Sequence, residues 1–259
     1  MIQDCAEITS RDNARIKYAC AVRDSEKQRA ADGLFFAEGP KLCLELAKSC
    51  TPRAAYATRA ALDKTPELAA LSPVPVAPHV AEKLAGTKSS QGVFVLFATP
   101  RPPEDLLDTA RRILMLEGVQ DPGNVGTLLR SAAAFGFDAV VLGPGCAAPF
   151  SPKTLRSSMG AAGRLPVVHR DNLSATIAAL RARGVTCLAA ALYRSRPLDE
   201  AGQNFPGGVC VVIGSEGQGL RDETVKACDA AVRIPMTDRV ESLNAAVAGS
   251  VLLWHFRGV

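Results

Sequence analysis

The chain has 259 residues, of which 47% are hydrophobic and 22% charged, a composition typical of a soluble globular protein with enough apolar residues for a core. This length allows one large domain or two ordinary ones. The formal net charge of +4 is too small to identify a nucleic-acid-binding protein by itself, so the position of the basic residues matters more than their total.

Cysteine and histidine spacing argues against a disulfide framework and against a zinc site. The eight cysteines include no CxxC pair, and the three histidines (His79, His169, His255) are scattered along the chain. The N-terminus lacks a secretory signal pattern, and no apolar stretch approaches the roughly 20 residues that a membrane span needs. We therefore expect a cytoplasmic protein with no metal and no membrane contact.

The first segment, residues 1–98, predicts a small α/β module. It opens with a basic stretch, residues 9–29, that holds six Lys or Arg against three Asp or Glu. Strand-like and helix-like pieces then alternate. The predicted strands are 34–38, 54–58, 73–77 and 92–97, and the predicted helices are 40–48, 60–71 and 79–84. A proline-dense stretch at 99–105 predicts a linker over residues 99–111.

The second segment, residues 112–259, repeats strand and then helix. Its strand-like runs are apolar without alternation, which is typical of parallel strands covered on both faces. The predicted strands are 113–116, 139–142, 185–190, 209–213 and 230–234, and the predicted helices are 125–135, 153–161, 174–183, 221–227 and 243–256. This pattern predicts an α/β fold with a parallel sheet.

Three polar, Gly-rich loops follow apolar runs in this second segment. They lie within LEGVQDPGNVGTLLRSAAAFGF (116–137), VVIGSEGQGL (211–220) and RIPMTDRVESLNAAVAG (233–249). Ligands in open α/β sheets bind outside the carboxyl ends of the strands. The three loops therefore predict a site at one edge of the sheet.

Each loop also has a purely structural interpretation. Asn124 can cap the helix that follows it, and Arg130 on that helix can be a solvated edge. Glu216 is either a loop carboxylate or a buried hydrogen-bonding anchor. Ser242 or Asn244 can cap the last helix, which is apolar nearly all round and is therefore either buried or packed on a partner.

Two further features bear on ligands. The GSEGQG loop is neither GxGxxG nor a P-loop, which disfavours a nucleotide-dependent oxidoreductase. The stretch 151–170 holds four basic residues and no acidic one between two predicted strands, which favours phosphate contact although such runs are often solvated faces.

Taken together, NVGTLLR, SPKTLRSSMGA, GSEGQGL and IPMTDRVESLN resemble the motifs of the SpoU (TrmH-like) RNA 2′-O-ribose methyltransferases of the SPOUT superfamily. SRDNARIK…KQRAADGLFFAEGPKL and SSQGVFVLF resemble the accessory RNA-binding domain of that family. Two departures are Ser215, where many relatives have Asn, and Asp238-Arg239, at a loop position that often contains Gly. The resemblance covers the whole chain.

The resemblance implies a C-terminal domain at 112–259 with a deep trefoil knot formed after Val209, and an L30e-like RNA-binding domain at 1–98. It implies S-adenosylmethionine as methyl donor, RNA (ribosomal RNA favoured, and within it large-subunit RNA) as substrate, and a homodimer through the C-terminal domain. The implied catalytic residues are Arg130, Asn124, Glu216, Ser242 and Asn244. The implied cofactor-binding residues are Gly214, Ile234, Leu243, Ala190, Gly219 and Met236. The candidate RNA-binding residues are Arg11, Arg15, Lys17, Lys27, Arg29, Lys153 and Arg156.

Two alternatives remain open on the same fold. One is a tRNA 2′-O-methyltransferase, and the other is a catalytically silent RNA-binding or ribosome-assembly factor. The presence of Arg130, Glu216 and Asn244 argues against the second, because a silent protein need not keep them.

Overall fold

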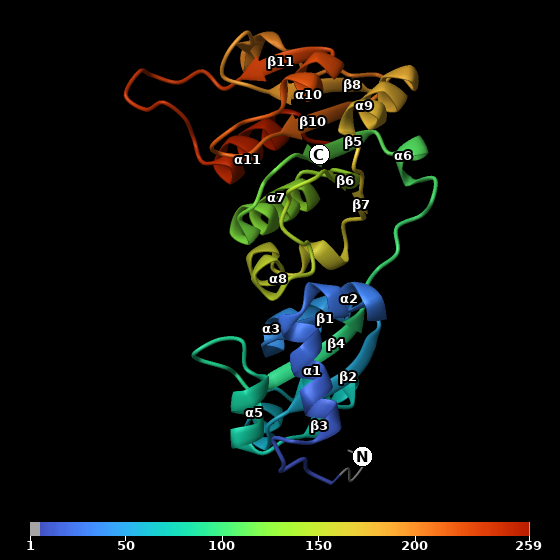
Figure 1. Cartoon of the computed structure of the whole chain (residues 1–259), viewed down its shortest axis with the longest axis vertical. Helices are drawn as coiled ribbons and strands as arrows, with labels where there is room; N and C mark the ends of the chain where they lie inside the picture. Colours follow the sequence, from blue (N-terminus) through green and yellow to red (C-terminus); the bar gives the residue numbers. More distant parts are fainter. Residues whose placement is uncertain (1–5, 259) are drawn as a thin grey trace. The chain divides into compact units, whose positions relative to one another are not determined.

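The computed structural model describes residues 6–258, which divide into two compact units (Figure 1). The N-terminal unit comprises Met1–Pro100 and Phe150–Arg164, and the C-terminal unit comprises Arg101–Pro149 and Leu165–Val259. Each unit has its own sheet.

A four-stranded sheet in the order β1-β4-β2-β3 forms the centre of the N-terminal unit. Its elements are α1 (Ala14–Asp24), α2 (Glu26–Asp32), β1 (Leu34–Glu38), α3 (Pro40–Leu46), β2 (Pro52–Ala57), α4 (Arg59–Lys64), η1 (Pro66–Leu71), β3 (Val74–Pro75), α5 (Pro78–Leu84) and β4 (Val93–Ala98). β4 pairs antiparallel with β1 and β2, whereas β2 and β3 are parallel. All four strands that the sequence predicts are present.

Helices α1 and α2 are additions to the predicted elements. α1 buries Ile16, Ala19 and Val22 completely, at the three-residue spacing of one helix face. Asn13 accepts a hydrogen bond from the Arg15 amide (2.9 Å) and so caps the helix. The basic stretch 9–29 is therefore an ordered, partly buried part of the unit.

Residues 150–164, which the sequence assigns to the second segment, pack with the N-terminal residues. They form α8 (Pro152–Ser158) and η2 (Ala161–Gly163). The Phe150 ring stacks on that of Phe35 with centroids 5.0 Å apart, and Arg164 forms an ion pair with Glu45. At Gly163 an added Cβ would lie 2.7 Å from the Cys50 sulfur, so a larger residue would displace this contact.

A seven-stranded parallel sheet in the order β7-β6-β5-β10-β8-β11-β9 forms the centre of the C-terminal unit. Its strands are β5 (Arg112–Leu116), β6 (Ala139–Leu142), β7 (Val167–His169), β8 (Thr186–Ala190), β9 (Arg196–Pro197), β10 (Val209–Ile213) and β11 (Ala230–Arg233). The five predicted strands and their parallel arrangement are confirmed. β7 and β9 are additions, and both are too short to give a clear pattern in the sequence.

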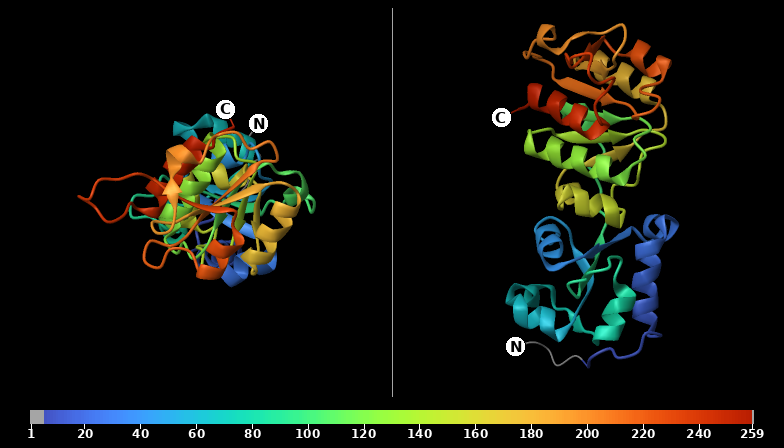
Figure 2. Two further views of the ribbon diagram at one scale, coloured as in Figure 1. Left: turned by 90° about the horizontal axis from the view of Figure 1, so that it is seen from above. Right: turned by 90° about the vertical axis from the view of Figure 1, so that its left-hand side faces the viewer.

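Helices cover both faces of this sheet (Figures 1 and 2). They are α6 (Leu106–Thr109), α7 (Pro122–Ala134), α9 (Leu173–Ala182), α10 (Asp222–Ala227) and α11 (Ala245–His255). A short 3₁₀ helix, η3 (Leu198–Glu200), lies between β9 and β10. α7 and α11 pack together on one face, and α9 and α10 lie on the other. At Gly249 an added Cβ would lie 2.3 Å from Leu128 and 2.7 Å from Ile213, so this glycine allows α11 to approach both α7 and β10 closely.

Candidate active site

The three polar loops leave the sheet at the same edge, as the sequence predicts. β5 and β10 are neighbouring parallel strands, and β8 lies between β10 and β11. The loop to α7 follows β5, the Gly214–Leu220 loop follows β10, and residues 234–243 follow β11. The carboxyl ends of parallel strands share one edge, so the three loops meet there.

A chain of side-chain hydrogen bonds joins all three loops. The Asn124 amide nitrogen donates to the Glu216 carboxylate, and the Asn124 amide oxygen accepts from the Asn244 nitrogen at 3.2 Å. Asn244 Oδ1 in turn accepts from the backbone amides of Ala246 (3.0 Å) and Val247 (3.2 Å), which caps α11. Residues 92 and 120 positions apart in the sequence are thus held in one fixed arrangement.

The cap of α7 differs from the prediction. Asp121, and not Asn124, is the N-cap: its carboxylate accepts from the amides of Gly123 (2.6 Å) and Asn124 (3.1 Å). The prediction that Asn124 caps this helix is therefore wrong. The consequence is functional, because Asn124 lies inside the first turn and its side chain is available to Glu216 and Asn244.

Glu216 is the hydrogen-bonding anchor of the second loop, but it is exposed rather than buried. Ser215 and Gly219 close the loop through reciprocal backbone hydrogen bonds of 3.3 and 3.0 Å. An added Cβ at Gly214 would lie 2.2 Å from the Gly219 carbonyl carbon, so only glycine fits at the base of the turn.

The structure does not bring every predicted catalytic residue to this chain of hydrogen bonds. Arg130 lies nearly two turns further along α7 and is exposed, and its side chain makes no hydrogen bond or ion pair with any other residue of the described range. A spacing of six helical residues corresponds to about 9 Å along the axis from Asn124. Ser242 is exposed in the loop before α11 and likewise has no side-chain partner within residues 6–258.

The predicted cofactor-binding residues lie at the same sheet edge. Ala190 ends β8, and Ile234 and Leu243 bound the third loop; all three are half-buried and apolar, whereas Met236 is exposed. An added Cβ at Gly217 or Gly219 would have no atom within 4 Å, so the backbone of the second loop faces open space. Half-buried apolar side chains beside an accessible polar backbone suit a ligand with an aromatic ring and several hydrogen-bonding groups. The residues present therefore fit S-adenosylmethionine.

One buried acid at this edge has no counterpart in the sequence-based prediction. Glu117 follows β5 directly and is 4% exposed, and it accepts hydrogen bonds from Arg221 and Thr224. A signal was present in the sequence, since Glu117 is an acidic residue at the end of an apolar run, where a carboxylate needs partners.

Among the candidate RNA-binding residues of the first unit, three have partners of their own. Arg11 pairs with Glu82 (2.7 Å) and Lys17 with Asp12 (3.0 Å). Arg29 donates to two backbone carbonyls of α1, at 2.8 and 3.0 Å, and burial lowers the pKa of its guanidinium. Its role in the structure is to hold α2 against the end of α1.

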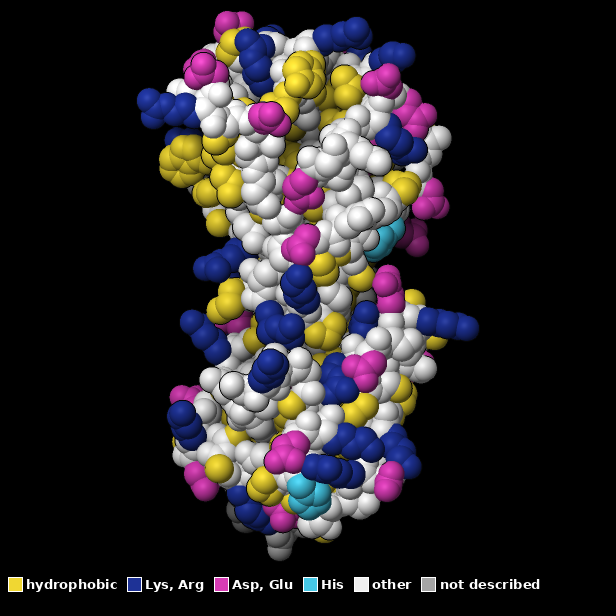
Figure 3. Space-filling model, turned by 60° about the vertical axis from the view of Figure 1, so that its left-hand side comes forward, with side chains coloured by type: hydrophobic (Ala, Val, Ile, Leu, Met, Phe, Trp, Pro, Cys, Tyr) yellow, Lys and Arg dark blue, Asp and Glu magenta, His cyan; other side chains and the backbone are white. Residues whose placement is uncertain are grey.

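Arg15 and Lys27 are exposed and make no side-chain hydrogen bond or ion pair with other described residues. Lys153 and Arg156 are exposed on α8, in the same compact unit. Figure 3 shows Lys and Arg side chains spread over the lower body, with Asp and Glu among them. On this face the cationic side chains are interspersed with acidic ones.

The SpoU rRNA methylase family matches residues 111–254, more than half of the chain. The chain belongs to this family. The match spans the three loops and their strands, so the hydrogen-bonded Asn124, Glu216 and Asn244 all lie within the SpoU region.

Named relatives and solved structures extend this comparison. The 23S rRNA (guanosine(2553)-2′-O)-methyltransferase RlmP of Bacillus subtilis is 42% identical over 60% of this chain, which spans 62% of that relative. An uncharacterized tRNA/rRNA methyltransferase of Synechocystis is 32% identical over 99% of this chain and 95% of its own length.

The structure of a TrmH-family protein from Porphyromonas gingivalis, 34% identical, superposes with a TM-score of 0.82 over 95% of this chain and 97% of its own. An AdoMet-bound rRNA methyltransferase from Sinorhizobium meliloti, 26% identical, superposes with a TM-score of 0.84 over 97% of each chain.

No group of three or more His, Cys, Asp or Glu residues within 6–258 could hold a metal ion. No helix in the same range is long and apolar enough to cross a membrane.

Proposed function

We propose that this protein transfers a methyl group from S-adenosylmethionine to a ribose 2′-hydroxyl of ribosomal RNA. The observation that carries the proposal is the hydrogen-bonded chain from Glu216 through Asn124 to Asn244, which unites the three motifs of the family. The names of the relatives, rRNA 2′-O-methyltransferases among them, support the substrate class. A ribosomal substrate places the protein in the cytoplasm.

Gly214, Gly219, the half-buried Ala190, Ile234 and Leu243, and Met236 of the third loop would hold S-adenosylmethionine. When bound, it would supply an electrophilic methyl group. The chain's own residues would align the acceptor oxygen and stabilise the negative charge that it acquires as its proton leaves to water, and alignment alone can contribute several kcal/mol.

Arg130 binds RNA phosphate in this proposal. Its guanidinium is exposed and unpaired within the described residues, and arginine is the side chain best suited to bind phosphate. A charged guanidinium can clamp a phosphate through two hydrogen bonds and stabilise negative charge on the neighbouring ribose oxygen. Ser242 and Asn244 position the RNA from the third loop.

A homodimer forms through the C-terminal unit. α11 exposes Val247 (52%), Val251 (38%) and Trp254 (53%), although its opposite side is buried against α7. These side chains and Thr127 of α7 line an open cavity of about 350 Å³. Exposed apolar surface of this kind favours association. Thr127 is one turn from Arg130, so a second protomer docked here would lie beside the catalytic arginine.

The finer fold assignments accompany this proposal. The C-terminal unit carries a deep trefoil knot formed after Val209, and the N-terminal unit is an L30e-like domain that recognises the RNA through exposed cations such as Arg15 and Lys27. The return of the chain from β11 to α11, which packs on α7 and β10, supports the knot.

A transfer assay with matched acceptors tests the proposal. Purified protein should methylate a ribosomal RNA fragment and should not methylate the same fragment carrying 2′-deoxyribose at the acceptor positions, because the 2′-hydroxyl is the reacting group. Equal transfer to the two acceptors would mean that the methyl group goes to a base, and the proposal would be wrong.

A further inference from the structure

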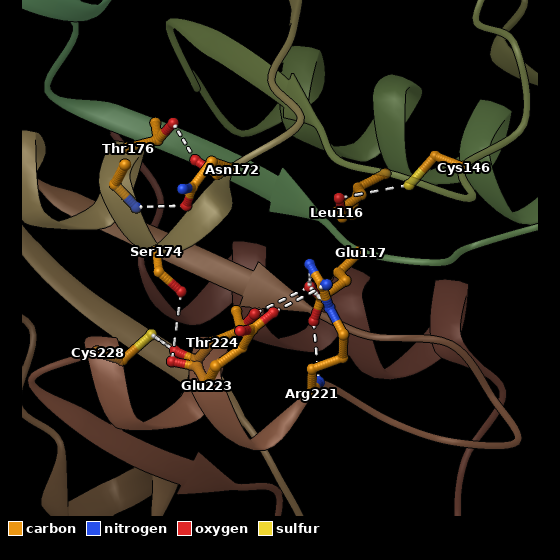
Figure 4. Close-up of polar contacts among 11 residues, drawn as sticks. Leu116, Glu117, Cys146, Asn172, Ser174, Thr176, Arg221, Glu223, Thr224 and Cys228 are labelled. Atoms are coloured by element: carbon orange, nitrogen blue, oxygen red, sulfur yellow. Dashed lines mark hydrogen bonds and ion pairs between the residues drawn. The ribbon is translucent and has the colours of Figure 1, made fainter.

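Glu117 is a buried carboxylate with an unusually complete set of donors. Its Oε2 accepts from the Arg221 backbone amide at 2.9 Å, and its Oε1 accepts from Arg221 Nε at 2.7 Å and from the Thr224 hydroxyl at 2.9 Å. Thr224 is fully buried, and Figure 4 shows the three side chains converging between β5 and α10. Burying a carboxylate is costly without such partners, so the three hydrogen bonds are what allow Glu117 to be buried here.

The partners of Glu117 lie at the two ends of the Gly214–Leu220 loop. The Glu117 backbone amide donates to the carbonyl of Ile213 (2.9 Å), the residue directly before the loop. The Glu117 side chain binds Arg221, the residue directly after it. One residue at the end of β5 therefore clamps the entry and the exit of the loop.

Arg221 pairs with two carboxylates, the buried Glu117 and the exposed Glu223. Arg221 turns its Nη1 outward to Glu223 at 2.8 Å, and its side chain is 53% exposed. The hydrogen bond that Arg221 donates to Glu117 raises the pKa of the Arg221 guanidinium, and the attraction between the two charges raises it further. Solvent therefore screens the outer pair with Glu223, and the geometry of the loop depends on the inner pair with Glu117.

We infer that Glu117 is a positioning residue for S-adenosylmethionine: it fixes the separation between the two ends of the glycine loop, and thereby the backbone that receives the cofactor. The inference rests on the proposed function. Gly217 and Gly219 have open space in front of their backbones, and Glu216, which anchors Asn124, is at the tip of the same loop. A shift of the loop end at Leu220 would therefore displace Gly217, Gly219 and Glu216 together.

Glu117→Gln tests the role with little change in shape. The amide replaces one acceptor oxygen by a donor, which then faces the N–H groups of Arg221 or the Thr224 hydroxyl. We expect the Kd and the KM for S-adenosylmethionine to rise about tenfold while the KM for RNA stays within twofold. A residue that only supported the fold would lower the amount of active enzyme and leave both KM values unchanged.

Two further variants keep the test decisive if Glu117→Gln does not fold. Arg221→Ala removes the side-chain contact but keeps the backbone amide on Oε2, and Thr224→Val removes one hydroxyl donor without changing the size of the side chain. Each should raise the cofactor Kd by a smaller factor than Glu117→Gln. Glu223→Gln, which touches only the outer side of Arg221, is the matched control and should bind S-adenosylmethionine as the wild type does.

Calorimetry with S-adenosylmethionine and steady-state kinetics with ribosomal RNA give the readouts. Wild-type cofactor affinity in folded Glu117→Gln, or in both Arg221→Ala and Thr224→Val, would overturn the inference. Equal loss of affinity in Glu223→Gln would also overturn it, because the outer pair would then be what matters. Absence of binding by the wild-type protein would instead overturn the proposed function.

Discussion

Asn124→Ala breaks the hydrogen-bonded chain at its centre. The substitution removes the donor to Glu216 and the acceptor for Asn244. A hydrogen bond to a charged group contributes about 1.5–3 kcal/mol, and because Glu216 and Asn244 are both exposed we take the lower half of that range. A loss of about 1.5–2 kcal/mol corresponds to a roughly 10- to 30-fold decrease in kcat/KM.

Asn124→Asp should be worse than Asn124→Ala. The aspartate still accepts from Asn244, but it places a second carboxylate against Glu216. Two like charges about 4 Å apart repel by about 4 kcal/mol at an effective dielectric constant near 20, and less where water screens them. We therefore expect a decrease in kcat/KM of more than about 100-fold at pH 7, from the sum of lost attraction and added repulsion.

The assay separates this effect from a loss of stability. Asp121 caps α7, so Asn124→Ala keeps the helix cap, and the free energy of unfolding should fall by no more than the about 1.5–2 kcal/mol of the lost hydrogen bonds. Transfer kinetics and thermal unfolding are measured on the same preparations. A normal kcat/KM in Asn124→Ala, or a higher kcat/KM in Asn124→Asp than in Asn124→Ala, would show that the hydrogen bonds of Asn124 do not support transfer.

Four other perturbations follow from the same structure. Arg130→Ala should abolish transfer with less than a twofold change in the calorimetric Kd for S-adenosylmethionine. Turnover near the wild-type rate would show that Arg130 does not belong to the active site. Gly214→Ala should abolish cofactor binding, since the new Cβ would lie 2.2 Å from the Gly219 backbone, and normal binding would show that the loop is not rigid. Val251→Asp should convert a dimer into a monomer in sedimentation velocity, and an unchanged sedimentation coefficient would place the interface elsewhere. Arg15→Glu combined with Lys27→Glu should raise the KM for RNA and reduce the slope of log affinity against log salt by about 1–2, and an unchanged slope would show that these cations do not contact phosphate.

Apolar runs were sufficient to predict the strands around the site. β5, β6, β8 and β10 are parallel strands buried over most of their length, so their sequences are nearly continuous apolar runs. β11 is buried only at Val232, but most of its residues are apolar too. The meeting of three loops follows from the polarity of such a sheet. In a parallel sheet all strands point the same way, so their carboxyl ends lie at one edge.

Side-chain partners could not be predicted in the same way. Asp121 and Asn124 are both good helix caps, and only the position of the first helical turn decides between them. The clamp of Glu117 on Arg221 joins residues 104 positions apart, which no local pattern reports. Residues 150–164 read as one more helix between two strands, and only tertiary packing of Phe150 on Phe35 assigns them to the first unit.

Nucleoside analysis of labelled RNA decides whether this protein methylates the ribose of ribosomal RNA. The purified protein is incubated with methyl-labelled S-adenosylmethionine and size-separated total RNA, and the labelled RNA is digested to nucleosides, with Arg130→Ala as the matched control. We expect label in 2′-O-methylribose of ribosomal RNA with the wild type and no label with Arg130→Ala. Label on a base, or equal label with Arg130→Ala, would contradict it.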